Sequence, residues 1–274
     1  ELLGLPFEAL RLRDGRVPAL LPSVVTWRRP ASMGATTYAP LPGPIKVLVA
    51  IAAPDEGRTS NVTLDLEREL QNILDAVDDA RRLDRFSVRI LEVGHANSIA
   101  RAFSPDVWHV LHLSCHGAPG ALVLEDEDGK EVPTTAKALL DGIKESGRSL
   151  PLVFLNACHG GVLDAAQTSS FALDLHRGGV GAVVARQTVV SDRYATELAR
   201  SFYGPPATQE PPRPSLALAL ARRELEQRRQ EARTRGAPAT ETQPEQATAA
   251  LYVLGDDVPL ADLGAPGVPL RVPP

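Results

Sequence analysis

Five short apolar runs alternate with amphipathic segments along this chain, and this alternation limits its fold more than any other feature. The runs are IKVLVAIA (45–52), FSVRILEV (86–93), VWHVLHLS (107–114), LPLVFLNAC (150–158) and VGAVVARQTVV (180–190). Most of them place apolar side chains at consecutive positions, which is typical of strands buried on both faces. The pattern therefore predicts an α/β fold, with a mostly parallel central sheet and helices on both faces.

The segments between these runs have helical spacing. We expect helices over 61–82, 135–144, 169–179, 191–203 and 214–232. The first of them has an acidic start and a basic end, which suit the helix dipole. Its predicted apolar face consists of Leu66, Leu70, Ile73, Leu74 and Val77. In the last helix, the charge run Arg222–Arg229 is predicted to be a solvated face.

The remaining segments predict smaller features. Residues 120–134 alternate around Asp128-Gly129, which indicates a hairpin. A last strand is expected over 248–257 and a short one near Ser23–Trp27, whereas 233–247 is predicted to be a mobile loop. We expect three parts in the chain: an N-terminal segment (1–44) of the same domain, truncated upstream, a main domain (45–257), and a Pro-rich linker or tail (258–274).

Composition excludes several classes of protein. The formal net charge of −5 is not that of a strongly basic nucleic-acid-binding domain. No apolar run approaches the roughly 18 residues needed to cross a membrane. Two cysteines in 274 residues do not form a disulfide framework, so a reducing, cytoplasmic location is expected. The Ala-, Arg- and Pro-rich composition favours a GC-rich bacterial source.

Two predicted strands end in residues that can carry out chemistry. One runs into HLSCHG (112–117) and the other into LNACHGG (155–161). Reactive groups in parallel sheets collect beyond the carboxyl ends of the strands. If these two strands are neighbours, His116 can face the thiol of Cys158, and the N–H groups of Gly117 and Cys158 can point at an oxyanion. The arrangement predicts cysteine-dependent acyl transfer.

HLSCHG followed by LNACHGG resembles the CHAT group of caspase-like cysteine peptidases, which are relatives of separase and are often joined to tetratricopeptide repeats. The resemblance extends to flanking blocks and covers nearly all of residues 2–256. Those blocks are LGLPFEAL (3–10), SVVTW (23–27), GGVGAVVARQTVVSDRYATELARSFY (178–203), LALALARRELE (216–226) and AALYVLGD (249–256).

The resemblance implies a caspase-like three-layer sandwich and a cysteine endopeptidase without a cofactor or metal. It implies that His116 is the general base or acid, that Cys158 is the nucleophile, and that the backbone of Gly117 and Cys158 forms the oxyanion hole. The expected partners are a protein or peptide substrate and a regulatory or sensor region of the tetratricopeptide type, but neither nucleic acid nor membrane. A bacterial regulatory or defence role is expected.

The resemblance also implies a substrate pocket beside the nucleophile strand and the next strand. Candidate charges there are Asp164, Asp192 and Arg186, and the sequence leaves open which of them faces the substrate. We expect a basic or small residue on the acyl side of the cut, because separase-like relatives favour basic ones. The chain departs from the family pattern where Arg186-Gln187-Thr188 replaces a common Trp, and where His159 follows the nucleophile. Asp192, or Ser191 before it, also suits a helix N-cap.

Other interpretations of these residues stay open. Cys115 is expected to be a buried thiol pointing away from His116, and His112 a hydrogen-bonded packing residue. A zinc site would draw on His109, His112, Cys115, His116, Cys158 and His159, although no CxxC or HExxH spacing is present.

Two alternative functions remain: a non-catalytic CHAT-like interaction module, and a flavodoxin-like ligand-binding domain. The second lacks a Gly-rich phosphate loop after the first strand, because AAPDEGRTSN (52–61) does not have the spacing of one.

Overall fold

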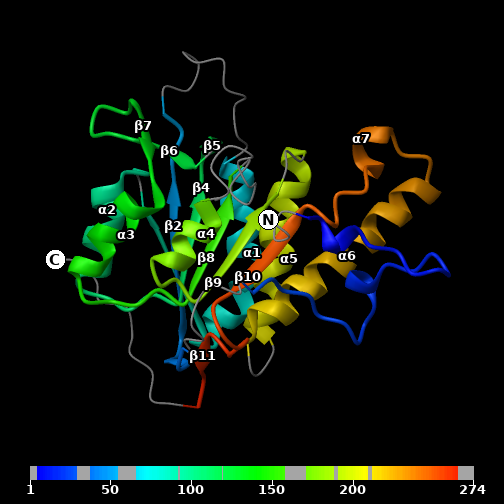
Figure 1. Cartoon of the computed structure of the whole chain (residues 1–274), viewed down its shortest axis with the longest axis horizontal. Coiled ribbons are helices and arrows are strands. Elements are labelled where there is room, and N and C mark those ends of the chain that lie inside the picture. The colour runs from blue at the N-terminus through cyan, green and yellow to red at the C-terminus, as the bar shows by residue number, and fades with distance from the viewer. Residues whose placement is uncertain are drawn as a thin grey trace.

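The computed structural model describes residues 5–29, 38–54, 66–91, 93–118, 120–157, 171–187, 191–208 and 212–264. Within these ranges the chain forms a six-stranded central sheet in the order β10-β9-β8-β4-β2-β3 (Figure 1). Its strands are β2 (Ile45–Ile51), β3 (Phe86–Leu91), β4 (Val110–Ser114), β8 (Leu152–Asn156), β9 (Ala182–Arg186) and β10 (Ala249–Val253). The first five run parallel, and β10 is antiparallel to β9. The prediction of a mostly parallel sheet is confirmed.

Helices cover both faces of the sheet and complete three layers (Figure 1). One face packs against α1 (Leu66–Arg82), α5 (Asp192–Thr208) and α6 (Pro214–Thr234). The other packs against α2 (Ala96–Phe103), α3 (Ala136–Glu145) and α4 (Phe171–Arg177). In the described ranges, no helix combines the length and apolar character needed to cross a membrane.

Alternation along each strand divides the core into two clusters. Phe154 and Val184 face α1, α5 and α6, whereas their neighbours Val153 and Val183 face α2, α3 and α4. All four side chains are fully buried or nearly so, and each contributes about 2 kcal/mol by leaving water. Both faces of the strands are thus apolar, as consecutive apolar positions predict.

The buried face of α1 differs from the predicted one. Ile73 and Val77 are buried as expected, but Leu70 and Leu74 are only half-buried. The buried stripe runs instead through Glu69, Ile73, Val77 and Ala80. These positions recur every three or four residues, so the predicted helical period is confirmed. The predicted buried face of the helix is wrong, because the true one includes a glutamate.

A second, three-stranded sheet begins where β4 ends. It consists of β5 (His116–Ala118), β6 (Ala121–Glu125) and β7 (Glu131–Thr134), in that order and antiparallel. The predicted hairpin is therefore confirmed. Its loop closes through a hydrogen bond from Asp126 N to Lys130 O of 2.9 Å, and Gly129 supplies the positive φ of +76°.

The terminal segments also pair. Strands β1 (Leu41–Pro42) and β11 (Ala261–Asp262) run parallel to each other, so part of the predicted tail has regular structure. The predicted strand near 23–27 is reduced to one bridge, between Arg28 and Tyr252. Short 3-10 helices, η2 (Phe7–Ala9) and η3 (Pro18–Leu20), precede it.

Residues 233–247 differ from the predicted mobile loop. They contain the end of α6 and a short helix, α7 (Ala239–Thr242). Glu245 anchors the segment, because its carboxylate accepts hydrogen bonds from Ser191. The polar composition that suggested mobility reflects contacts with α5 and α6.

The prediction of a solvated face over Arg222–Arg229 is wrong at Arg222, which is fully buried. Its guanidinium donates to Thr26 Oγ1 at 2.8 Å and to Ala249 O at 2.6 Å, and it lies 3.7 Å from the carboxylate of Glu8. Partners from the N-terminal segment and from β10 make this burial possible. Arg228, six residues further along α6, is partly exposed as predicted.

Candidate active site

The two strands predicted to carry the dyad are neighbours. Strands β4 and β8 pair in parallel, and Ser114 lies opposite Asn156 at their carboxyl ends. His116 follows Ser114 by two residues, and Cys158 follows Asn156 by two residues. Cys158 itself lies outside the described residues. The condition under which His116 and Cys158 could meet is therefore satisfied, and their contact stays a prediction.

His116 and Gly117 form the start of β5, just beyond the end of β4. They pair with Val123 and Leu122 of β6, and both are half-buried. The chain thus leaves the central sheet at Cys115, and β6 supports the backbone of the predicted base. Cys115 is only 2% exposed and belongs to the apolar cluster beneath α2, α3 and α4. Its predicted role as a buried thiol is confirmed.

A buried carboxylate that the sequence analysis missed lies beneath the two strand ends. Glu69 of α1 is 3% exposed. Its Oε2 accepts a hydrogen bond from Ser114 Oγ at 2.6 Å, and its Oε1 lies 2.9 Å from His112 Nε2 and accepts from Asn156 Nδ2. A signal was available, because Glu69 precedes Ile73 and Val77 by four and eight residues and so occupies the apolar face of its helix.

His112 is a packing residue with hydrogen bonds, as predicted. Its ring stacks on Phe154 with 4.9 Å between centroids, and its Nδ1 lies 3.0 Å from the hydroxyl of Tyr203. Burial, together with the nearby Glu69 carboxylate, raises the pKa of Tyr203 well above its ordinary value. The hydroxyl therefore keeps its proton at neutral pH.

The structure describes the three candidate pocket residues to different extents. Arg186, the last residue of β9, is 4% exposed and lies on the same face as Val184, toward α5 and α6. Asp164 lies outside the described residues. Asp192 is the first residue of α5, and its side chain is not among those described. Their roles in a substrate pocket stay predictions.

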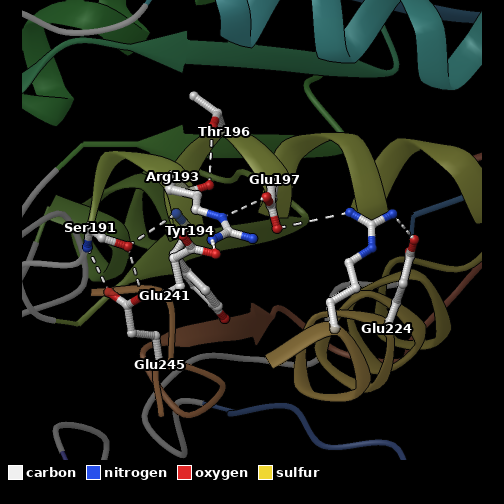
Figure 2. Close-up of polar contacts among 9 residues, drawn as sticks. Ser191, Arg193, Tyr194, Thr196, Glu197, Glu224, Glu241 and Glu245 are labelled. Carbon is white, nitrogen blue, oxygen red and sulfur yellow. Dashed lines mark hydrogen bonds and ion pairs between the residues drawn. The ribbon is translucent and has the colours of Figure 1, made fainter. Parts of the chain in front are cut away.

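Ser191 caps α5. Its hydroxyl accepts a hydrogen bond from Tyr194 N at 3.2 Å, which satisfies one of the free N–H groups of the first turn. Figure 2 shows Glu245 facing Ser191, whose backbone N–H and hydroxyl donate to the two carboxylate oxygens at 2.6 and 2.8 Å. The connection between β9 and α5 is thereby tied to the segment before β10.

A pocket between α5, α6 and α7 lies beside this cap, and charged side chains line it. Figure 2 shows Arg193 reaching toward Glu197 on the same helix, with an ion-pair distance of 2.9 Å, and Arg193 also lies 2.8 Å from Glu241. Glu197 is 3.9 Å from Arg228. These opposite charges neutralise one another. Of the predicted site residues whose side chains the structure describes, none lines the pocket.

The residues considered for zinc are spread over the sheet. His109 lies near the amino end of β4, where its Nδ1 accepts a hydrogen bond from Lys46 N at 3.0 Å. Burial, with a smaller contribution from the charge of Lys46, lowers the pKa of His109 to about 4. Within the described ranges, no group of three His, Cys, Asp or Glu residues is arranged to hold a metal ion; Cys158 and His159 lie outside these ranges.

The N-terminal segment reaches the end of β9 through a buried ion pair. Arg28 donates to both carboxylate oxygens of Glu8, at 3.2 and 2.5 Å, and both side chains are almost fully buried. The same guanidinium donates to Gln187 Oε1 at 2.8 Å. Gln187 directly follows β9, so residues before the main domain contact the connection that leads to Asp192.

Several solved structures align with this chain. The Arg-specific cysteine proteinase gingipain R aligns with a TM-score of 0.50 and 14% identity, over 79% of this chain and 46% of that one. A secreted C11 cysteine protease from Bacteroides thetaiotaomicron, in complex with an irreversible peptide inhibitor, aligns with a TM-score of 0.45 and 10% identity, over 68% and 59% of the two chains. The Saccharomyces cerevisiae separase–securin complex aligns with a TM-score of 0.46 and 11% identity, over 80% and 13%. The likeness to gingipain shows that the fold is caspase-like.

The chain therefore spans less than two thirds of the length of each of these three proteins. Among curated proteins, none matches this chain in sequence. The CHAT domain family matches residues 1–253, which include both strand ends and the N-terminal segment. This match covers most of the chain, and the chain therefore belongs to the CHAT domain family.

Proposed function

We propose that this chain is a cysteine endopeptidase that cleaves protein or peptide substrates through His116 and Cys158. One observation carries the proposal: Ser114 and Asn156 are paired at the ends of adjacent parallel strands, each two residues before a member of the dyad. Reactive groups collect at the carboxyl edge of a parallel sheet, which is where the proposal puts the imidazole of His116 and the thiol of Cys158. Family membership and the caspase-like fold support the same chemistry.

The reaction follows from these groups. His116 takes the proton of the Cys158 thiol, and the thiolate attacks the carbonyl carbon of the scissile amide. The N–H groups of Gly117 and Cys158 stabilise the oxyanion that develops. His116 then returns the proton to the departing amine as the C–N bond breaks, which leaves a thioester on Cys158. Water, deprotonated by His116, hydrolyses the thioester and restores the thiol.

Substrate choice is proposed to depend on the connection after β9. Asp192 begins α5 and Arg186 ends β9, so both flank this connection, and Asp164 follows the nucleophile in sequence. An acidic group facing the substrate would favour a basic residue on the acyl side of the cut through a charge-assisted contact. We therefore propose a preference for a basic or small residue there.

Control by a sensor region is the regulatory part of the proposal. The contact from Arg28 to Gln187 supports it, because it joins the N-terminal segment to the start of the connection between β9 and α5. A movement of the N-terminal segment would therefore be transmitted through Arg28 and Gln187 to the connection that is proposed to flank the substrate. Family resemblance suggests a tetratricopeptide-type partner and a cytoplasmic, bacterial setting for this control.

The proposal is tested with Cys158→Ala and the matched variant Cys115→Ala on a fluorogenic peptide. Loss of the nucleophile should lower kcat/KM at least about 10³-fold, whereas loss of the buried thiol should leave most of the activity. Activity should require a reducing agent and survive a strong chelator. Equal losses in the two variants would contradict the assignment, and a Cys158 that never reacts would favour a non-catalytic interaction module.

A further inference from the structure

The Glu69 carboxylate joins the two strands that lead to the dyad. Ser114, at the end of β4, donates its hydroxyl proton to Oε2 at 2.6 Å. Asn156, the register partner of Ser114 at the end of β8, donates its amide to Oε1. One side chain from α1 is thus bonded to both strands at the last position before each of them leaves the sheet. All three side chains are at least 95% buried.

The third hydrogen bond to Glu69 comes from His112, and the proton of Tyr203 decides which nitrogen of the His112 ring donates it. Tyr203 has a proton to donate, and His112 Nδ1, 3.0 Å away, can accept it. The Nε2–H of His112 then donates to Glu69 Oε1 at 2.9 Å. His112 from β4 and Tyr203 from α5 are the titratable groups that face Glu69 among the described residues. The two oxygens of the carboxylate thus accept hydrogen bonds from three donors, on β4 and β8.

The connection from Glu69 to the dyad is short along the backbone. Only Cys115 separates Ser114 from His116, and only Ala157 separates Asn156 from Cys158. Cys115 and Ala157 are both buried in the apolar cluster on the opposite face of the sheet. Each strand end is therefore held on one face by apolar packing and on the other by Glu69.

We propose that Glu69 is a positioning residue for the dyad, and that its carboxylate fixes the separation of the strand ends that carry His116 and Cys158. The inference rests on the proposed function of these two residues. A change of about 1 Å in the separation of reacting groups costs on the order of 10²-fold in rate. Glutamine at this position keeps the size of the side chain but has one acceptor oxygen for three donors.

The test compares Glu69→Gln with Asp106→Asn, a matched change at the other end of the sheet. Asp106 is also 3% exposed and pairs with Lys46 at the amino end of β2, at 3.6 Å. Both variants are made with Cys115→Ala, so Cys158 is the remaining one of the two cysteines. The measurements are the melting temperature, the pH profile of Cys158 alkylation by iodoacetamide, and kcat and KM for a peptide.

We expect Glu69→Gln to shift the alkylation profile toward that of His116→Ala by about one pH unit, because a displaced imidazole promotes the thiolate less. Its kcat should fall about 10²-fold with KM changed less than about threefold. Asp106→Asn should lower the melting temperature and leave the alkylation profile in place. Glu69→Asp, which keeps a carboxylate, should recover part of the loss. Should Glu69→Gln fail to fold, Ser114→Ala removes one of the three donors and should give a smaller shift in the same direction.

The outcomes separate the two proposals. A shift in His116→Ala but none in Glu69→Gln would overturn the positioning role and leave the dyad standing. If Glu69→Gln and Asp106→Asn lower the melting temperature equally and shift the alkylation profile equally, the role of Glu69 is merely structural. That result would also overturn the positioning role. No shift in His116→Ala would disprove the dyad, and with it the positioning role.

Discussion

Ser114 and Asn156 lie directly opposite each other in the register of two adjacent parallel strands, and both donate hydrogen bonds to the same buried carboxylate, that of Glu69. Parallel pairing brings residues at equal distances beyond such a pair to the same edge of the sheet. The positions two residues further on are His116 and Cys158. The register thus relates two motifs that are 42 residues apart in the sequence.

His116→Ala should slow the labelling of Cys158 by iodoacetamide near neutral pH. An imidazole within reach of a thiol promotes the thiolate, which is the reactive form. The measurement is the second-order labelling rate, followed by mass spectrometry and compared with the unmodified chain. Labelling at an unchanged rate would mean that the two residues do not meet, even if Cys158→Ala is inactive.

Substrate preference should be basic or small on the acyl side of the cut. Three fluorogenic peptides that differ only in Arg, Ala or Asp at this position measure it through kcat/KM. Arg186 is buried toward α5 and α6, so Arg186→Glu tests whether its charge reaches the substrate. A clear preference for Asp, weakened selectively by Arg186→Glu, would reverse the expectation and assign the pocket charge to Arg186.

Replacing Arg222 should destabilise the fold much more than replacing Arg228 on the same helix. Arg222→Ala removes a buried guanidinium that donates to Thr26 and Ala249 and leaves the carboxylate of Glu8 with one cation fewer. We expect the free energy of unfolding to fall by about 3 kcal/mol. For Arg228→Ala, which removes partly exposed ion pairs with Glu197 and Glu224, we expect less than about 1 kcal/mol. Urea denaturation checks both values, and similar losses would refute the structural role of Arg222.

Stability should fall as the pH is lowered from about 6.5 toward 4, in part because of His109. Its folded pKa is about 4, below the ordinary value of 6.5, so within this window the unfolded chain binds a proton that the folded chain does not. The full contribution of His109 is present above pH 6.5 and is lost by about pH 4. The loss over this window amounts to about 3 kcal/mol.

The variant His109→Asn checks this pH dependence. Asparagine offers an acceptor for the N–H of Lys46 but does not titrate. The unfolding free energy of the variant should therefore depend less on pH between 4 and 6.5. A residual slope is expected from His176, whose pKa burial also lowers. The same slope in the variant and the unmodified chain would rule out His109 as a source.

The sequence by itself determined the local structure and the layout of the motifs. Consecutive apolar residues predicted the strands of the parallel sheet, and the hairpin signal at Asp128-Gly129 predicted β6 and β7. These features depend on interactions between residues close in sequence, or on a demand for burial that a single segment carries alone. Alternation along the strand predicted that Cys115 is a buried thiol, and the position of His112 within the strand predicted a buried packing residue.

Tertiary structure alone decided which strands are adjacent and which charged groups are buried. The order that places β4 beside β8 is not encoded in the periodicity of either strand. Glu69 and Arg222 were missed or misplaced because a charged side chain can be buried only where donors or acceptors from other segments meet it. Those partners lie up to 87 residues away from Glu69 and 214 residues away from Arg222, and only the folded chain brings them together.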